Sequence, residues 1–180
     1  MRKTEAERRG LAELPREFLI VGEGGVYLQP CRLDTLLGSC VAVTFHCPVR
    51  KAGGIFHALL PVKSNYSRPG CVESEYRFVD SAINSICSDF LAMGVQPRRL
   101  EAKVFGGSNA LSEQEGIGRA NVEAAYVALK SHGIRVLFTS AGGKQGRRII
   151  FLPHTGEVYM KLLGVSEACP IQERRSGQRS

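Results

Sequence analysis

The chain has 180 residues, of which 43% are hydrophobic and 23% are charged, and its formal net charge at pH 7 is +7. This composition is that of a folded globular domain and excludes collagen-like, coiled-coil and wholly disordered proteins. The positive charge gathers in the first and last ten or so residues, and the body has no basic stripe interleaved with aromatic residues, so we expect no nucleic-acid binding.

The first half of the chain predicts mainly strands. Residues 17–21 and 26–29 are rich in β-formers and flank the glycines of GEGG, a pattern that is typical of a hairpin. Residues 40–46 and 54–60 predict a second antiparallel pair. Residues 62–74 form the longest irregular stretch and predict a surface loop.

Two helices follow from apolar residues that recur at helical spacing. The first is predicted between Glu73 and Gly94, where the glycine is placed as a C-terminal stop. The second is predicted between Gly118 and His132. Its expected core stripe consists of Val122, Ala125, Tyr126 and Leu129.

The remaining segments predict four more strands. Residues 102–107 run into the glycines of FGGSN, which make a turn or let the backbone approach a ligand closely. Residues 134–141, 147–153 and 157–163 are separated by GGKQG and HTG, which we interpret as hairpin turns. Because strands and helices do not alternate regularly, we expect an α+β fold: a layered α/β sandwich of largely antiparallel or mixed sheets with two main helices packed on them.

The sequence predicts one domain at residues 16–164, between basic tails at residues 1–15 and 165–180. The early apolar run at residues 18–22 is too short for a signal peptide or a membrane span, so we expect a cytoplasmic protein without membrane insertion. The cysteines stand at positions 31, 40, 47, 71, 87 and 169. In the cytoplasm they stay reduced, and their spacing does not favour a zinc site.

Cys40 and His57 are the strongest candidates for chemistry. If their two strands form a symmetric hairpin with Cys40 opposite His57, then Val41 lies opposite Phe56 and Val43 opposite Gly54, with the apolar residues on the other face. Directly opposed side chains in a sheet are close enough for a thiol and an imidazole to hydrogen-bond. A buried cysteine beside an ordinary core histidine is the alternative interpretation.

The residues before Cys40 suit a thiol catalyst. A nearby imidazolium or backbone N–H groups lower the pKa of a thiol, and the N–H groups of Gly38 and Ser39 could face the oxyanion of a reacting carbonyl. Either Thr35 or Asp34 is near enough to orient the histidine.

Several blocks in order resemble the chemoreceptor glutamine deamidases of the CheD family. They are LGSCVAV (37–43), HALLP (57–61), KVFGGS (103–108), IGRANVEAAYVAL (117–129) and AGGKQGRRIIF (141–151). The resemblance covers residues 16 to 164 and implies a layered fold.

The resemblance implies that Cys40 is the nucleophile, His57 its base and Thr35 the third member of a triad. It implies conversion of glutamine side chains of methyl-accepting chemotaxis receptors to glutamate, with release of ammonia through a thioester and without metal or cofactor. It also implies a CheC-type phosphatase as a partner. Two alternatives stay open: a binding module for a phosphatase or receptor with a vestigial Cys40, and a cysteine peptidase with the same pair.

Overall fold

The structure, a computed structural model, describes residues 12–66, 73–108 and 116–164. Its elements in chain order are β1 (Arg16–Phe18), β2 (Gly24–Tyr27), β3 (Arg32–Leu37), β4 (Val41–Cys47), β5 (Ala52–Ala58), α2 (Lys63–Tyr66), η1 (Glu75–Arg77), α3 (Val79–Ala92), η2 (Pro97–Arg99), β6 (Glu101–Gly106), α4 (Ile117–Ser131), β7 (Arg135–Ala141), β8 (Arg147–Leu152) and β9 (Glu157–Leu162). Part of the predicted loop, residues 67–72, lies outside the described residues, as do most of the predicted tails.

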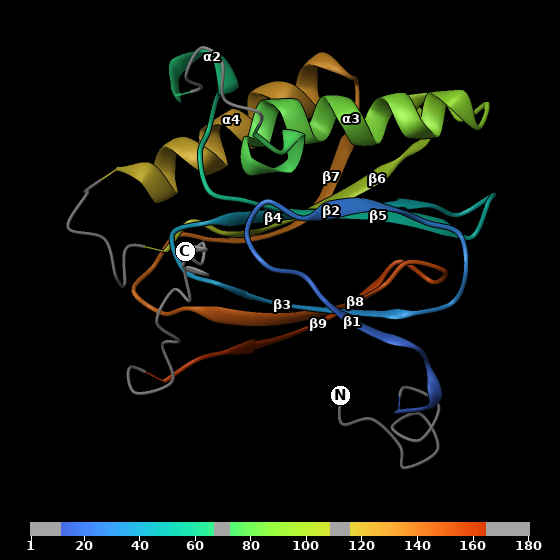
Figure 1. Ribbon diagram of the computed structural model, residues 1–180, viewed down its shortest axis with the longest axis horizontal. Helices are drawn as coiled ribbons and strands as arrows, with labels where there is room; N and C mark the ends of the chain where they lie inside the picture. The colour runs from blue at the N-terminus through green and yellow to red at the C-terminus, as the bar shows by residue number, and fades with distance from the viewer. Residues whose placement is uncertain (1–11, 67–72, 109–115, 165–180) are drawn as a thin grey trace, which may run out of the picture.

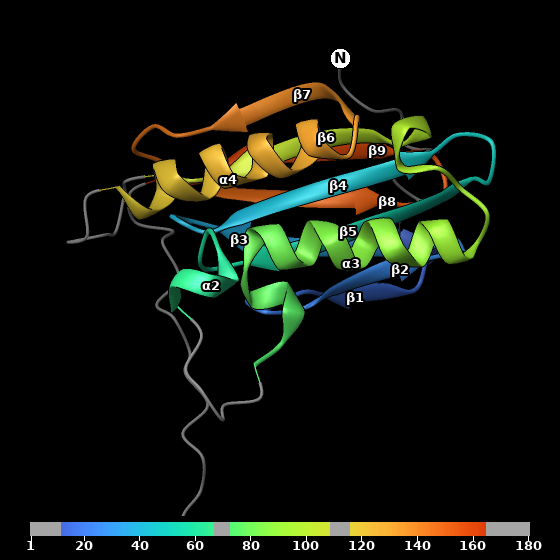
Figure 2. The same ribbon diagram turned by 90° about the horizontal axis from the view of Figure 1, so that it is seen from above.

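Two β-sheets stack face to face, and both long helices cover the outer face of one of them (Figure 1). The covered sheet has the strand order β2-β5-β4-β6-β7, and the other sheet has the order β1-β3-β8-β9. Seen from above, α3 lies over β2 and β5, and α4 lies toward β6 and β7 (Figure 2). Both sheets are mixed, because β1–β3 and β6–β7 are parallel and the other pairs are antiparallel. The predicted α+β sandwich is confirmed.

One core cluster joins the five-stranded sheet to the helices. The buried apolar side chains of α3 include a stripe at the predicted helical spacing, and Ser81 and Ala82 are buried as well. The stripe consists of Val79, Ile83, Ile86, Cys87 and Phe90. Gly94 follows the helix with a φ of 77°, the left-handed conformation in which glycine ends helices. On α4, the predicted stripe is wrong at Tyr126, which is 41% exposed, whereas Asn121 is fully buried.

A second core cluster lies between the two sheets. It consists of Leu19, Leu33, Leu37, Ala42, Ile55, Phe105, Ile149 and Phe151. Since alternate residues of a strand face opposite sides, Ala42 and Ile55 point into this layer while Val43 and Phe56 point toward the helices. Strands β4 and β5 are therefore buried on both faces, which explains their nearly continuous apolar sequence.

Two of the predicted hairpins are wrong. β1 pairs with β3 in the four-stranded sheet, whereas β2 pairs with β5 in the other sheet. β7 pairs with β6, whereas β8 pairs with β3 and β9. GEGG and GGKQG thus carry the chain from one sheet to the other, while the β8–β9 hairpin through HTG is confirmed. Glycine allows the chain to turn but does not determine which strand it pairs with afterwards.

The β4–β5 hairpin is confirmed, but its predicted register is wrong. Ala42, not Cys40, pairs with His57, and Phe56 pairs with Val43 instead of Val41. The connection runs through residues 48–51, and Lys51 adopts a positive φ of 49°, so the turn is centred one residue later than predicted. The shift is by two residues on one strand, and alternation therefore keeps Cys40 and His57 on the same face.

Candidate active site

Cys40 lies where the chain passes from one sheet to the other. β3 ends at Leu37 in the four-stranded sheet, and β4 begins at Val41 in the five-stranded sheet, so Gly38-Ser39-Cys40 form the bend between them. Cys40 is partly buried and packs against the cluster between the sheets. Its thiol is free.

His57 and Thr35 meet across the two sheets. Thr35 comes from β3, His57 comes from β5, and the Thr35 Oγ1 lies 2.9 Å from the His57 Nδ1. The threonine hydroxyl donates its hydrogen to the carbonyl oxygen of Leu19, at 2.8 Å, so it accepts from the imidazole. This hydrogen-bond network assigns the imidazole proton to Nδ1 and leaves a lone pair on Nε2.

The Nε2 atom of His57 is buried and has no hydrogen-bond partner among the described residues. Cys40 stands two positions before Ala42, the residue that pairs with His57, and on the same face of the sheet. Such diagonal neighbours have Cα atoms about 7–8 Å apart, which is within reach of side chains. The free lone pair of His57 and the Cys40 thiol therefore occupy neighbouring positions at the edge of the layer between the sheets.

Burial keeps both groups neutral. It raises the pKa of the Cys40 thiol to about 11, although the backbone N–H of Cys40 partly offsets this by favouring the thiolate. Burial also lowers the pKa of His57 to about 4, against a smaller opposing effect of the Leu19 carbonyl. Of the two causes expected to lower the thiol pKa, the backbone N–H acts in that direction but is outweighed by burial, and the direction of the His57 shift favours a neutral imidazole over an imidazolium.

Asp34 lies on the opposite face of β3 from Thr35. Its carboxylate is fully buried and pairs with Arg16, Arg32 and Arg148. Of the two candidates for orienting the histidine, Thr35 contacts His57, and Asp34 is engaged by three arginines of the four-stranded sheet. The sequence left this choice open because the two residues are neighbours and lie at nearly the same distance from Cys40 along the chain.

The carbonyl oxygens of the Gly38-Ser39-Cys40 bend are all engaged. Those of Gly38 and Cys40 accept backbone N–H groups of Ser108 and Gly107, at 2.9 and 2.8 Å. The carbonyl of Ser39 accepts the side-chain Nδ2 of Asn121, at 3.2 Å. These three hydrogen bonds hold the backbone of the bend in place. The predicted oxyanion support from Gly38 and Ser39 would require a bend that is held in this way.

The glycines of FGGSN allow the chain to approach this bend closely. Gly106 and Gly107 have positive φ values of 115° and 63°. A Cβ on Gly106 would collide with the carbonyl oxygen of Cys40, and one on Gly107 would lie 2.6 Å from the carbonyl oxygen of Gly118 in α4. The close approach that the sequence suggested for a ligand is therefore an approach to the Cys40 bend and to α4.

Arg147 is a further buried group at this end of the sandwich. It is only 4% exposed, and its guanidinium donates to the carbonyl oxygens of Gly106 and Gly142. Burial lowers the pKa of this guanidinium. Arg147 joins GGKQG to FGGSN, and thus indirectly to the Cys40 bend.

Sequence reasoning missed Asn121, Ser108 and Arg147, all of which are buried. Asn121 carried a usable signal, since it stands four residues before Ala125 on the apolar stripe of α4 and a polar residue there needs a partner. For Arg147 no comparable signal exists, because two adjacent arginines at the start of a strand are usually solvated.

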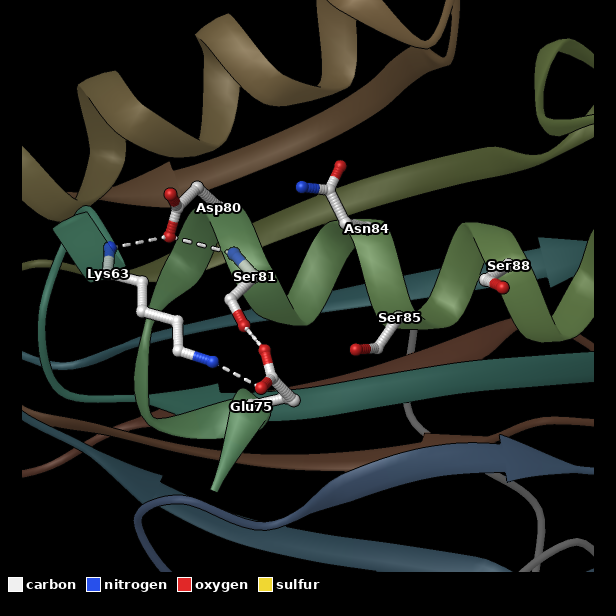
Figure 3. Close-up of a pocket in the computed structure, with 7 residues that line it drawn as sticks. All are labelled: Lys63, Glu75, Asp80, Ser81, Asn84, Ser85 and Ser88. Carbon is white, nitrogen blue, oxygen red and sulfur yellow. Dashed lines mark hydrogen bonds and ion pairs between the residues drawn. The ribbon is translucent and has the colours of Figure 1, made fainter. Parts of the chain in front are cut away.

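A separate hollow of about 410 Å³ lies over the start of α3 (Figure 3). Its lining is polar and consists of Lys63, Glu75, Asp80, Ser81, Asn84, Ser85 and Ser88. Lys63 and Ser81 pair with Glu75 there, and Asp80 accepts the backbone N–H groups of Lys63 and Ser81. The hollow contains none of the three residues Cys40, His57 and Thr35.

Within the described part of the chain, no group of three or more His, Cys, Asp or Glu side chains is arranged to hold a metal ion. None of the helices in the same residues has both the length and the apolar character needed to cross a bilayer.

Residues 59–162 match the model of a protein family named CheD, described as CheD chemotactic sensory transduction. The chain is 37% identical over 159 residues to the probable chemoreceptor glutamine deamidase CheD 2 of Geobacter sulfurreducens, covering 87% of this chain and 95% of that protein. It is 35% identical over 161 residues to the chemoreceptor glutamine deamidase CheD of Thermotoga maritima, covering 88% of this chain and 99% of the relative.

The family match begins just after His57, whereas the matches to the relatives extend further. An alignment that covers 87% of a chain of 180 residues necessarily includes residues 35–57, wherever it begins. The segment that contains Thr35, Cys40 and His57 therefore lies within the span that aligns with the Geobacter sulfurreducens protein.

Proposed function

The chain belongs to the CheD family, and we propose that it is a chemoreceptor glutamine deamidase in which Cys40 is the nucleophile, His57 the proton carrier and Thr35 the residue that orients His57. The observation that carries the residue assignment is the hydrogen bond between Thr35 and the His57 Nδ1. This hydrogen bond leaves the unprotonated Nε2 of the neutral histidine on the side of the ring away from Thr35. A cysteine nucleophile needs such a base beside its thiol.

The first half of the reaction forms a thioester. The Cys40 sulfur attacks the carboxamide carbon of a glutamine side chain while the thiol proton passes to His57 Nε2. Because the resting pair is neutral, this transfer accompanies the attack instead of preceding it. The carbon–nitrogen bond then breaks, and His57 returns the proton to the departing nitrogen, which leaves as ammonia.

The second half hydrolyses the thioester. His57 Nε2 takes a proton from a water molecule as the water oxygen attacks the thioester carbon. The carbon–sulfur bond breaks, the proton returns to the Cys40 sulfur, and the product is a glutamate side chain. In both halves the transient oxyanion lies near the backbone N–H groups of the bend, in keeping with a supporting role for Gly38 and Ser39.

The test is deamidation of a purified chemoreceptor cytoplasmic domain, followed by intact-mass measurement and peptide mapping. Deamidation replaces an amide NH2 by OH at defined glutamines, whereas a peptidase would release fragments and a binding module would leave the receptor unchanged. We expect Cys40→Ala to abolish the mass change, and His57→Ala to lower turnover by about 10²-fold or more.

Thr35→Val and Asp34→Asn form a matched pair, because the two residues are neighbours on opposite faces of β3. Thr35→Val removes the contact with the His57 Nδ1 and should lower turnover by about 10-fold or more, in line with the contribution of a general base that must be held in place. Asp34→Asn should leave the turnover of the folded protein nearly unchanged. Full activity in Thr35→Val together with loss in Asp34→Asn would assign the third position to the carboxylate.

We also propose that residues 16–164 form the deamidase domain, with residues 1–15 and 165–180 as basic tails outside it. We propose a cytoplasmic location, with which the free thiols of the four described cysteines are compatible. A CheC-type phosphatase is the partner we propose besides the receptor. Co-purification of such a phosphatase with the Cys40→Ala protein would support this partner. A phosphatase that does not bind would rule the partner out.

A further inference from the structure

We propose that Asn121 is a positioning residue, whose amide group ties the bend that carries Cys40 to the strand end that follows His57. Its Nδ2 donates to the carbonyl oxygen of Ser39 at 3.2 Å and to that of Leu59 at 2.9 Å. Ser39 is the residue before Cys40, and Leu59 follows His57 by two positions. The inference relies on the proposed function only for the roles of Cys40 and His57.

The orientation of this amide is unambiguous. Both of its partners are carbonyl oxygens, which only accept, so the atom between them must be the nitrogen with its two hydrogens. Asn121 is fully buried, and its Oδ1 has no hydrogen-bond partner in the part of the chain that the structure describes. A buried carbonyl oxygen without a partner is unfavourable. The two hydrogen bonds donated by Nδ2 are therefore made at the expense of leaving the Oδ1 without a partner.

Asn121 acts where the strand pairing stops. The ladder between β4 and β5 ends at the pair Val41 and Ala58, so no strand pairing joins Cys40 to Leu59. At that point the single amide of Asn121 takes up one carbonyl oxygen from each side. Asn121 thus holds the Cys40 bend and the segment after β5 together beyond the last strand pair. In this way it fixes the distance between the Cys40 sulfur and the His57 Nε2.

Asn121 can also be tested independently of the backbone. Of the three donors that hold the carbonyls of the bend, those of Gly107 and Ser108 are backbone groups, whereas that of Asn121 is a side chain. Substitution at position 121 thus releases one carbonyl and leaves the other two held. The helix that carries Asn121 is anchored separately, by the close contact of Gly118 with Gly107.

Release of the bend should affect reactivity and turnover in opposite directions. The pKa of Cys40 is about 11 because the thiol is buried, against an ordinary value of 9.0. A looser bend admits water, so the pKa should fall toward 9.0 and the thiol should react faster with a small alkylating agent. Turnover should nevertheless fall, because displacing a reacting group by about 1 Å can lower a rate by about 10²-fold.

The experiment compares the wild-type protein with Asn121→Leu, which keeps the branched shape and removes both donors, and Asn121→Ser, which retains one hydroxyl donor. Alkylation of Cys40 by iodoacetamide is followed from pH 7 to above pH 10 by peptide mass spectrometry, and kcat and KM are measured on a receptor domain. Asn84→Leu is the control, since Asn84 is an exposed residue of α3 that contacts His132 and neither catalytic segment.

We expect the midpoint of Cys40 alkylation to move to lower pH and kcat to fall, with KM unchanged, most in Asn121→Leu and less in Asn121→Ser. Asn84→Leu should match the wild type. A folded Asn121→Leu protein with the wild-type alkylation midpoint would overturn the proposal, even if its turnover fell. If Asn121→Leu does not fold, Asn121→Ser decides by the same criteria.

Failure of the proposed function would look different. A wild-type protein that leaves receptors unmodified, while its Asn121 variants still shift the alkylation midpoint, refutes deamidation and leaves the role of Asn121 intact. A wild-type protein that deamidates receptors, with alkylation profiles that are the same in all variants, refutes the role of Asn121 alone.

Discussion

At the residue scale, the protonation state of His57 bears on the mechanism that we propose for the pair. A neutral histidine whose Nδ1 is held by Thr35 offers a base that is fully available at neutral pH, and the thiol beside it stays protonated until a carbonyl arrives. A thiol whose pKa is raised by burial should react slowly with oxidants and alkylating agents, because these reactions proceed through the thiolate.

The same burial predicts a loss of stability in acid. The pKa of His57 is about 4 in the folded protein and 6.5 ordinarily, so the unfolded chain binds more protons between these values. The free energy of unfolding should therefore decrease as the pH falls from about 6.5 to about 4, and the shift corresponds to about 3 kcal/mol. Denaturant unfolding at pH 7 and pH 4.5 measures this decrease.

His57→Gln is the control, because glutamine does not titrate. Acidic residues contribute equally to both proteins, and the decrease between pH 7 and pH 4.5 should therefore be smaller in His57→Gln than in the wild type. An equal decrease in the two proteins would mean that His57 is protonated in the fold as readily as in the unfolded chain.

At the element scale, the contact between α4 and the FGGSN turn supports the Cys40 bend. A Cβ on Gly118 would lie 2.7 Å from the carbonyl oxygen of Gly107. Gly118→Ala should thus separate the turn from the helix and lower both kcat and the melting temperature, although alanine is ordinarily the better helix former. Thermal unfolding and receptor deamidation measure the two effects.

Gly25→Ala is the matched control for Gly118→Ala. Gly25 lies on the edge strand β2, and the nearest atom to an added Cβ there is 3.9 Å away, an ordinary contact. We expect Gly25→Ala to retain wild-type turnover. Comparable losses in the two variants would show that any added methyl group disturbs the enzyme, and would remove the special role of the Gly118 contact.

The sequence predicted the elements better than their partners. Local periodicity located α3 and α4 and most strands, because side-chain burial repeats at the period of the element itself. The sheet to which β2 or β7 belongs depends on contacts that are distant in sequence, which turn glycines do not encode. For the candidate site, the pattern singled out Cys40 and His57 and left Thr35 and Asp34 as alternatives, and these assignments stay predictions. Asn121 and Arg147 contact backbone carbonyls, and such contacts follow no spacing rule in the sequence.

At the scale of the whole molecule, the packing of the two sheets assembles the site. Thr35 belongs to one sheet and His57 to the other, so their contact exists only when the layer between the sheets is well packed. A defect in that layer should therefore disturb catalysis more than an equal defect beneath the helices. Phe151 lies in the layer between the sheets, and Phe90 lies in the core between the five-stranded sheet and the helices. Both side chains are completely buried.

We expect Phe151→Leu and Phe90→Leu each to lower the free energy of unfolding by about 1–3 kcal/mol. At a temperature where both variants are folded, Phe151→Leu should have the lower kcat, because its cavity opens beside β3 and β8. Equal kcat values at equal stability would show that the distance between Thr35 and His57 tolerates repacking of the layer between the sheets.

The pairing of β3 with β8 has a consequence for the synthesis of the protein. Thr35 is held opposite Ile149, so the strand that completes its sheet leaves the ribosome more than a hundred residues after Thr35 itself. The pairing of β4 with β5, by contrast, is local, because only residues 48–51 separate the two strands, and local pairings form early. We therefore expect a truncated chain that ends before β8 to lose the contact between Thr35 and His57, because β3 would lack its partner strand, and to leave receptors unmodified. On this expectation, activity would appear only once translation is nearly finished, and incomplete chains would be inactive.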